Sequence, residues 1–246
     1  MQKNQMSKVV LEIAAFNLEA ALNALAAGAD RVEFCENPQE GGTTPSFGSL
    51  ANLISLTTNP VFPIIRPRGG DFFYTNNEFN AMRSDILMVR KLDYPGVVIG
   101  LLNADGTIDT ERTKRLVEIA SPMEVTFHRA FDRCIDPFQA LEDIISTGCK
   151  RILTSGQVPN VADGLPLMKK LVEQAGDRII IMPGSGVRSN NIDQIIQSTG
   201  AKEIHSSARQ MQSSKMLYTK ASMNENLQAT GVDTEEIKKM LASLES

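Results

Sequence analysis

The chain of 246 residues has little cysteine and no tryptophan, and it contains no long apolar run. Its apolar runs are far shorter than the roughly 20 residues that a membrane-spanning helix needs, so we expect no membrane partner. The opening residues, MQKNQMSKVVLEIAAF, contain no long apolar segment before a cleavage site of small residues, and we expect no secretory signal. The three cysteines, Cys35, Cys134 and Cys149, lack CxxC spacing, which predicts reduced thiols in a cytoplasmic protein.

An excess of basic residues is also missing. The chain carries 25 basic and 29 acidic residues, its net charge is −4, and its pI is near 5.4. A nucleic acid or an anionic membrane would favour a basic patch, so we expect neither as a partner. An apolar fraction of 42% and a charged fraction of 22% are instead those of a globular protein that buries a core.

Short runs rich in β-branched residues alternate with segments whose apolar residues recur three and four positions apart. Eight such units in about 250 residues are typical of a (β/α)8 TIM barrel, and we predict this α/β fold as a single domain over residues 1–246. A doubly wound open sheet is the alternative, but it usually has fewer strands and a glycine-rich first turn. The first turn here, AAFNLEAA, lacks glycine, and we expect no nucleotide cofactor. The predicted strands cover residues 9–16, 31–35, 62–67, 96–102, 123–129, 151–156, 179–186 and 203–208.

Capping residues mark the ends of several predicted helices. Asp136 precedes Pro137 at the start of one helix, and Gly148 supplies its left-handed end. Thr75 and Glu78 have the spacing of a capping box at the start of another. These signals divide the chain into the same alternating units as the apolar pattern does.

Three segments lie outside the repeating units. Residues 1–8 form a predicted N-terminal tail, and residues 233–244 form a predicted last helix that packs onto the barrel. The stretch 209–232 is polar, weakly periodic and long for a connection. It predicts either a functional loop or an oligomer contact.

Polar residues collect at the C-terminal ends of the predicted strands, where TIM barrels carry their catalytic groups. The candidate general acids or bases are Glu12, Glu33, His128 and His205. Both histidines of the chain lie at such ends, which favours a site over two unrelated structural histidines. For the two glutamates, a buried ion-pair network without a catalytic role is the alternative.

An anion site is predicted beside these groups. The stretch IIRPRGGDFFY, residues 64–74, places two arginines at the end of the third strand, and arginine binds phosphate or carboxylate in a bidentate manner. The glycines of IMPGSGV, residues 181–187, precede a helix predicted to begin near Ser189, and such a turn favours an anion. The predicted anion-binding residues are Arg66, Arg68, Arg129, Ser155, Gly184, Ser185, Gly186 and Ser206.

Six motifs in order resemble those of the CutC family, namely ADRVEFCENPQEGGTTPS, IIRPRGGDFFY, VTFHRAFD, RILTSGQ, IMPGSGV and EIHSSA. The resemblance spans residues 9–224, nearly the whole chain. It implies a TIM barrel, a cytoplasmic location, a homo-oligomer and a role in copper homeostasis. It also implies copper ligands, which are cysteines near the ends of the first two strands. Cys35 occupies the second of these positions, and Ala14 stands at the first.

Two hypotheses of function follow. The resemblance implies a protein that binds Cu(I) through Cys35. A further donor such as Cys134, Met182 or else His205 would have to assist, because Cu(I) prefers thiolate or thioether ligands and one thiolate makes a poor site. Cys35 as a small, inert apolar residue is the alternative reading of that position. The polar residues themselves predict a barrel enzyme that acts on a small phosphorylated or carboxylated metabolite. In either case the predicted partner is a small molecule or an ion.

Overall fold

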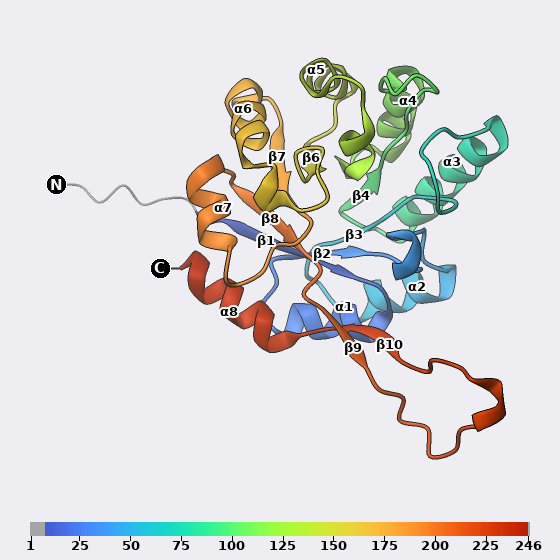
Figure 1. The fold of residues 1–246 in the computed structure, drawn as a ribbon. Helices are drawn as coiled ribbons and strands as arrows, with labels where there is room; N and C mark the ends of the chain where they lie inside the picture. The colour runs from blue at the N-terminus through green and yellow to red at the C-terminus, as the bar shows by residue number, and fades with distance from the viewer. Residues whose placement is uncertain (1–7, 246) are drawn as a thin grey trace.

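The structure is a computed structural model that describes residues 8–245, so residues 1–7 of the predicted tail lie outside the described residues. Parallel strands form a ring at the centre of the molecule, and helices surround them (Figure 1). The predicted α/β (β/α)8 barrel is thereby confirmed. The strands of the ring are β1 (Val10–Ala15), β2 (Arg31–Phe34), β3 (Val61–Pro63), β4 (Gly96–Ile99), β5 (Glu124–Phe127), β6 (Arg151–Thr154), β7 (Ile180–Pro183) and β8 (Glu203–Ser206).

The ring consists of two sections of parallel strands. One section has the order β3-β2-β1-β8, and the other has the order β4-β5-β6-β7. A parallel bridge between Ile64 and Val98 joins β3 to β4, and β7 contacts β8 at the second seam. Every strand is shorter than its predicted run, because the chain leaves the ring early and its next residues line the mouth.

Alternation along the strands separates two interiors. Leu11 and Ile13 of β1 belong to the main apolar core between the strands and the helices. Glu12, between them, is fully buried on the opposite face, inside the ring. The ring also holds a small apolar cluster that consists of Cys35, Phe62, Ile64 and Val98. The inside of this barrel is therefore partly charged.

Two helices begin at the residues that the capping signals indicate. Thr75 and Glu78 form the predicted capping box, and the Asp136 carboxylate accepts hydrogen bonds from two backbone N–H groups of the next helix. Gly148 ends that helix in the left-handed conformation, at a φ of 89°. The α-helices described are α1 (Leu18–Ala26), α2 (Phe47–Leu56), α3 (Asn76–Lys91), α4 (Thr110–Ala120), α5 (Pro137–Thr147), α6 (Leu165–Ala175), α7 (Ile192–Thr199) and α8 (Thr234–Leu244). Among residues 8–245 no helix is long and apolar enough to span a bilayer.

The long segment 209–232 forms a hairpin arm. Its strands β9 (Arg209–Gln212) and β10 (Ala229–Val232) pair antiparallel, and the arm extends away from the barrel (Figure 1). The short 3-10 turn η4 (Ala221–Met223) lies near its tip. Large apolar side chains are exposed on the arm, among them Met216, Leu217 and Tyr218.

Candidate functional site

A cavity of about 370 Å³ opens at the C-terminal ends of the strands. It lies where active sites of TIM barrels are found. Seven of the predicted site residues line this cavity, namely Glu33, Arg66, His128, Arg129, Ser185, Gly186 and His205. The structure therefore brings groups from five different parts of the sequence to one opening.

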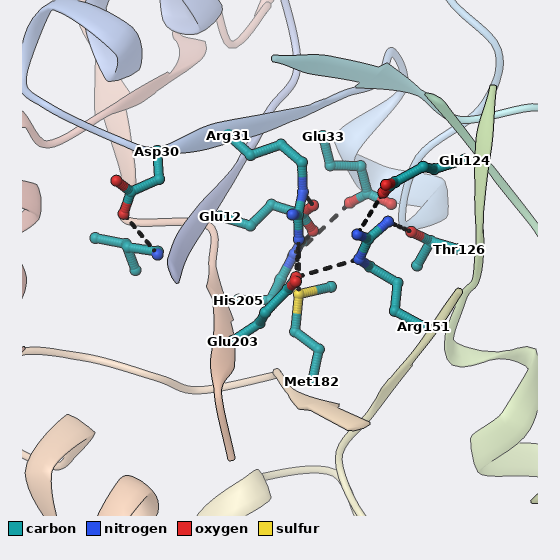
Figure 2. A network of polar contacts seen from close by, with 11 residues as sticks. Glu12, Asp30, Arg31, Glu33, Glu124, Thr126, Arg151, Met182, Glu203 and His205 are labelled. Atoms are coloured by element: carbon teal, nitrogen blue, oxygen red, sulfur yellow. Dashed lines mark hydrogen bonds and ion pairs between the residues drawn. The ribbon is translucent and has the colours of Figure 1, made fainter. Parts of the chain in front are cut away.

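The floor of the cavity carries a carboxylate–imidazole–carboxylate arrangement. His205 Nδ1 lies 2.7 Å from Glu12 Oε1, and His205 Nε2 lies 3.8 Å from Glu33 Oε2. The three side chains come from β8, β1 and β2, whose register places Glu12 directly opposite His205. All three residues are buried, and Figure 2 shows the histidine between the two glutamates. This group can hold, accept or release a proton at the floor of the cavity.

A buried ion-pair network lies beneath this floor (Figure 2). Arg31 donates to both Glu12 and Glu203, and Arg151 donates to Glu203 over 3.1 Å and to Glu124 over 2.6 Å. The two guanidinium groups also lie against the Phe62 ring, each 5.1 Å from its centroid. The network balances buried charges of opposite sign and fixes the Glu12 carboxylate from below.

The environment of each titratable group on the floor shifts its pKa. Burial opposes ionisation of Glu12, but the Arg31 guanidinium and His205 outweigh it and lower its pKa to about 2. Burial, helped by the Glu12 charge, raises the pKa of Glu33 to about 7. For His205, the Glu12 hydrogen bond and the charge of Glu33 outweigh burial and raise the pKa. Glu12 is thus a fixed anion, whereas Glu33 exchanges its proton near neutral pH.

Arginines surround the cavity above this floor. Two of them contact the Phe72 ring, whose centroid lies 5.0 Å from Arg66 Cζ and 5.6 Å from Arg133 Cζ. Burial and the neighbouring Arg129 charge lower the pKa of Arg133. Within residues 8–245, Arg66, Arg133 and Arg209 have no ion-pair partner, so the rim carries an excess of positive charge.

Arg66 lines the cavity but also holds its loops together. Its guanidinium donates to the carbonyls of Glu40, Gly42 and Gly70, which fixes the loops after β2 and β3. Arg129 is similarly engaged, because it pairs with Asp132 at 2.6 Å and donates to the hydroxyls of two serines. Both arginines contribute charge to the cavity while their hydrogen bonds build its walls.

Four predicted anion-binding residues have other roles in the structure. Arg68 lies outside the cavity, where Glu78 and Asp71 hold its guanidinium. The Gly184 N–H donates to the Thr154 carbonyl, and the Ser206 hydroxyl donates to the Val187 carbonyl. The Ser155 hydroxyl is buried between Arg129 and Asp132 and does not line the cavity.

The expected helix N-terminus behind the 181–187 turn is also displaced. The prediction of a helix beginning near Ser189 is wrong, because α7 begins at Ile192 and residues 189–191 form a turn. Gly184 is glycine for a steric reason instead, since a Cβ there would lie 2.5 Å from Leu153 Cδ1. Anion binding by this turn therefore rests on Ser185 and Gly186, which line the cavity.

His128 is held as a neutral ring. Its Nδ1 accepts the backbone N–H of Ala130 at 3.1 Å, at the start of the 3-10 helix η2 (Arg129–Arg133). Burial and the nearby Arg66 charge lower its pKa to about 3. A base with so low a pKa accepts protons poorly at neutral pH, so Glu33 is the better candidate for general base.

The residues around Cys35 do not fit a Cu(I) site. The Cys35 thiol is buried, and burial together with the Glu33 charge raises its pKa, which opposes the thiolate that Cu(I) prefers. Ala14 stands beside the cavity without a sulfur. Cys134 Sγ contacts Gln157, and Met182 Sδ contacts Arg31. In the described part of the chain, no group of three or more His, Cys, Asp or Glu residues has a metal-binding arrangement.

Sequence reasoning missed the charged residues at the N-terminal ends of the strands. Arg31, Arg151 and Glu203 are the first residues of β2, β6 and β8, whereas the prediction considered mainly C-terminal ends. The alternation of side chains along each strand could have revealed these residues. Arg31 shares a strand face with Glu33, and Glu203 shares one with His205. Charged residues two apart at the start of a buried strand indicate an inward-facing network.

Comparisons with known proteins agree with the motifs. The CutC family model matches residues 9–210. A CutC family protein from Salmonella heidelberg strain SL476 is 48% identical over 222 residues, which cover 89% of each chain. The crystal structure of CutC from Streptococcus agalactiae, named for copper homeostasis, matches with a TM-score of 0.77 at 34% identity, over 81% of this chain and 98% of that one. Phosphoribosyl anthranilate isomerase from Thermotoga maritima has a TM-score of 0.60 at 16% identity, over 96% of this chain and 98% of that one, and shows the fold alone. The chain described here belongs to the CutC family.

Proposed function

We propose that the mouth of the barrel binds a small organic anion, a phosphorylated or carboxylated metabolite, and that the floor transfers a proton to or from it. One observation supports this proposal, namely that a single cavity combines arginines at its opening with acid–base groups at its floor. Arginines without carboxylate partners among residues 8–245 surround its opening, and His205 lies at its floor between Glu12 and Glu33. Guanidinium groups bind phosphate and carboxylate, and a buried carboxylate–imidazole group supports acid–base chemistry.

In this proposal Arg133 and Arg209 hold the charged end of the ligand. Each lines the cavity, and neither is paired with a carboxylate in the described residues. Phe72 and Phe16 support them through cation–π contacts, and Arg133 Nη1 also donates to the Arg129 carbonyl. Glu33 acts as the general base or acid, and Glu12 keeps His205 in place through the 2.7 Å hydrogen bond.

Direct copper binding is the second candidate function, and the name of the Streptococcus agalactiae relative supports it. In this chain Cys35 would have to supply the thiolate without a second cysteine at Ala14. The surroundings of Cys35 oppose that role, so a part in copper homeostasis would require something other than a two-cysteine Cu(I) site. We propose a cytoplasmic location with either function, because all three thiols are free and buried.

A thermal-shift screen of phosphorylated and carboxylated metabolites tests the anion pocket, because a ligand that binds the native state raises the melting temperature. We expect Arg133→Gln to weaken binding of a hit about tenfold or more. Arg83→Gln on α3 removes the same charge from a residue that does not line the cavity and is the matched control. Equal binding by wild type and Arg133→Gln would refute the proposed arginine contact.

A competition titration of the reduced protein with Cu(I) tests the second candidate. We expect wild type and Cys35→Ala to bind Cu(I) with the same affinity, since the thiol is buried and beside a carboxylate. A loss of affinity of about a hundredfold in Cys35→Ala would instead establish a specific copper site at this residue.

A further inference from the structure

The imidazole of His128 has a fixed tautomer. A ring nitrogen that accepts a hydrogen bond carries no proton, and Nδ1 accepts the Ala130 N–H. The proton of the neutral ring therefore lies on Nε2. A doubly protonated ring would place an N–H group against the Ala130 N–H, so this geometry also excludes the imidazolium form.

The Nε2–H group lacks a protein partner. His128 is 4% exposed, and Nε2 is buried without a hydrogen-bond acceptor among residues 8–245. Leaving a buried donor unsatisfied costs roughly 1–3 kcal/mol, and such groups in native proteins call for an explanation. His128 borders the cavity, so a molecule bound there is the acceptor that we infer for this donor.

The surroundings hold the ring in place and keep it uncharged. Its ring centroid lies 4.9 Å from that of Phe72 and 6.1 Å from that of Phe127. The absence of a side chain at Gly100 leaves space for the ring, because a Cβ there would lie 2.3 Å from it. The charges of Arg66 and Arg133 near the ring oppose its protonation. The chain thus builds a rigid, neutral N–H donor beside an arginine-lined cavity.

We propose that His128 donates its Nε2–H to a carbonyl oxygen of the bound anion, so that the ligand is an anionic keto or aldehyde compound. This inference rests on the proposed function and narrows its ligand class. The arginines serve the charged group of such a ligand, which leaves the Nε2–H for a second oxygen of the ligand. A neutral imidazole N–H can polarise a carbonyl and stabilise negative charge that develops on its oxygen. His128 is then an electrophilic group, whereas its sequence position had indicated a general acid or base.

Two matched probes test this assignment. Hydroxyacetone phosphate and n-propyl phosphate share the phosphate and chain length, and they differ only by a carbonyl in place of a methylene. We expect calorimetric titration of the wild type to show about tenfold tighter binding of hydroxyacetone phosphate, the size of one well-placed hydrogen bond to a buried donor. A site built around a donor rejects the analogue that lacks the acceptor.

The variant His128→Asn removes the Nε2–H donor and can keep the hydrogen bond with the Ala130 N–H. The asparagine Oδ1 can accept the Ala130 N–H as Nδ1 does, but the side chain has no group at the position of Nε2. We expect this variant to bind both phosphates with equal affinity, and His128→Gln, whose amide N–H reaches that position, to keep part of the preference. A preference unchanged in His128→Asn would overturn the assignment.

Nitrogen NMR of the imidazole rings reports the tautomer of His128 and does not require either variant to bind a phosphate. The chain has two histidines, so comparison with His128→Asn assigns both sets of signals. We expect a neutral ring with the proton on Nε2 from near pH 5 to near pH 8, and a shift of that signal on addition of hydroxyacetone phosphate. A ring that protonates near pH 6, or carries its proton on Nδ1, would overturn the assignment.

The outcomes also separate this inference from the proposed function. If both phosphates bind the wild type equally, the anion pocket stands and the role of His128 is refuted. If neither phosphate binds, the anion pocket fails for phosphorylated ligands and the carbonyl assignment fails with it.

Discussion

At the residue scale, the site depends on how single side chains share charge. Glu12 and Glu33 lie on either side of one histidine, yet the pKa of Glu12 falls to about 2 while that of Glu33 rises to about 7. The difference follows from Arg31, which donates directly to Glu12 and to Glu203. The two glutamates therefore take different roles. Glu12 is a fixed anion, and Glu33 is an acid that can exchange its proton.

Glu33 makes the unfolding free energy depend on pH. Because its folded pKa is raised above the ordinary value of 4.5, the folded state holds this proton more tightly than the unfolded state does. This contribution is fully present below pH 4.5 and is lost as the pH rises toward 7. In Glu33→Gln this pH dependence is absent. We therefore expect the unfolding free energy of the variant, relative to that of the wild type, to rise by about 2 kcal/mol between pH 5 and pH 8.

Urea unfolding near pH 5 and near pH 8 measures this change. Glu19→Gln on the exposed side of α1 makes the same change outside the cavity and is the matched control. A Glu33→Gln variant with the same pH dependence as the wild type would show that Glu33 ionises in the folded protein as it does in the unfolded chain.

Residue types and their positions predicted the ring of eight strands and the convergence of seven residues on one cavity. They did not predict which hydrogen bonds each side chain makes. Arg68 has the same residue type and strand-end position as Arg66, yet a capping-box glutamate, Glu78, draws it away from the mouth. Such choices depend on distances between loops that sequence spacing does not contain.

At the element scale, local signals predicted the helices well. The Thr75–Glu78 box and the Asp136 cap lie where their spacing indicated, because a cap involves backbone groups only two or three residues away. The start of α7 was not predicted, since Asn191 makes no side-chain cap and Asn191 Oδ1 instead accepts the Arg188 N–H. Strand lengths were overestimated for a related reason, because buried loop residues in the mouth have the same composition as strands.

The Asp136 cap gives an element-scale prediction. Its carboxylate accepts the N–H groups of Phe138 and Gln139 at 2.9 and 3.1 Å. We expect Asp136→Ala to lower the unfolding free energy by about 1 kcal/mol, measured by chemical denaturation. Asp143→Ala removes an acidic residue from the middle of the same helix and should cost about 0.5 kcal/mol or less. Equal effects of the two substitutions would contradict a specific capping role.

At the scale of the whole molecule, the hairpin arm over 209–232 stands apart from the barrel. It exposes Met216, Leu217 and Tyr218 in the segment between its two strands, and exposed apolar side chains gathered in one place favour contact with another protein surface. The sequence predicted that this segment is a functional loop or an oligomer contact. Its projection from the barrel suits a contact with a second copy of the chain.

We expect light scattering on the eluted wild-type protein to give a mass above the 26.9 kDa of one chain. The double variant Met216→Asp with Leu217→Asp should shift the mass toward the monomer, because buried carboxylates at a contact are costly. Its melting temperature at high dilution should match the wild type, since neither side chain belongs to the apolar core. A monomeric wild type would refute the contact.

The central claim is that the mouth of this CutC family barrel is a pocket for an organic anion. The most direct test is a crystal structure grown with Cu(I) and the best anionic hit together, with anomalous diffraction recorded at the copper edge. We predict ligand density in contact with Arg133 and the His128 Nε2–H, and no copper peak at Cys35 Sγ. A copper peak at Cys35 with no ligand in the mouth would contradict the account.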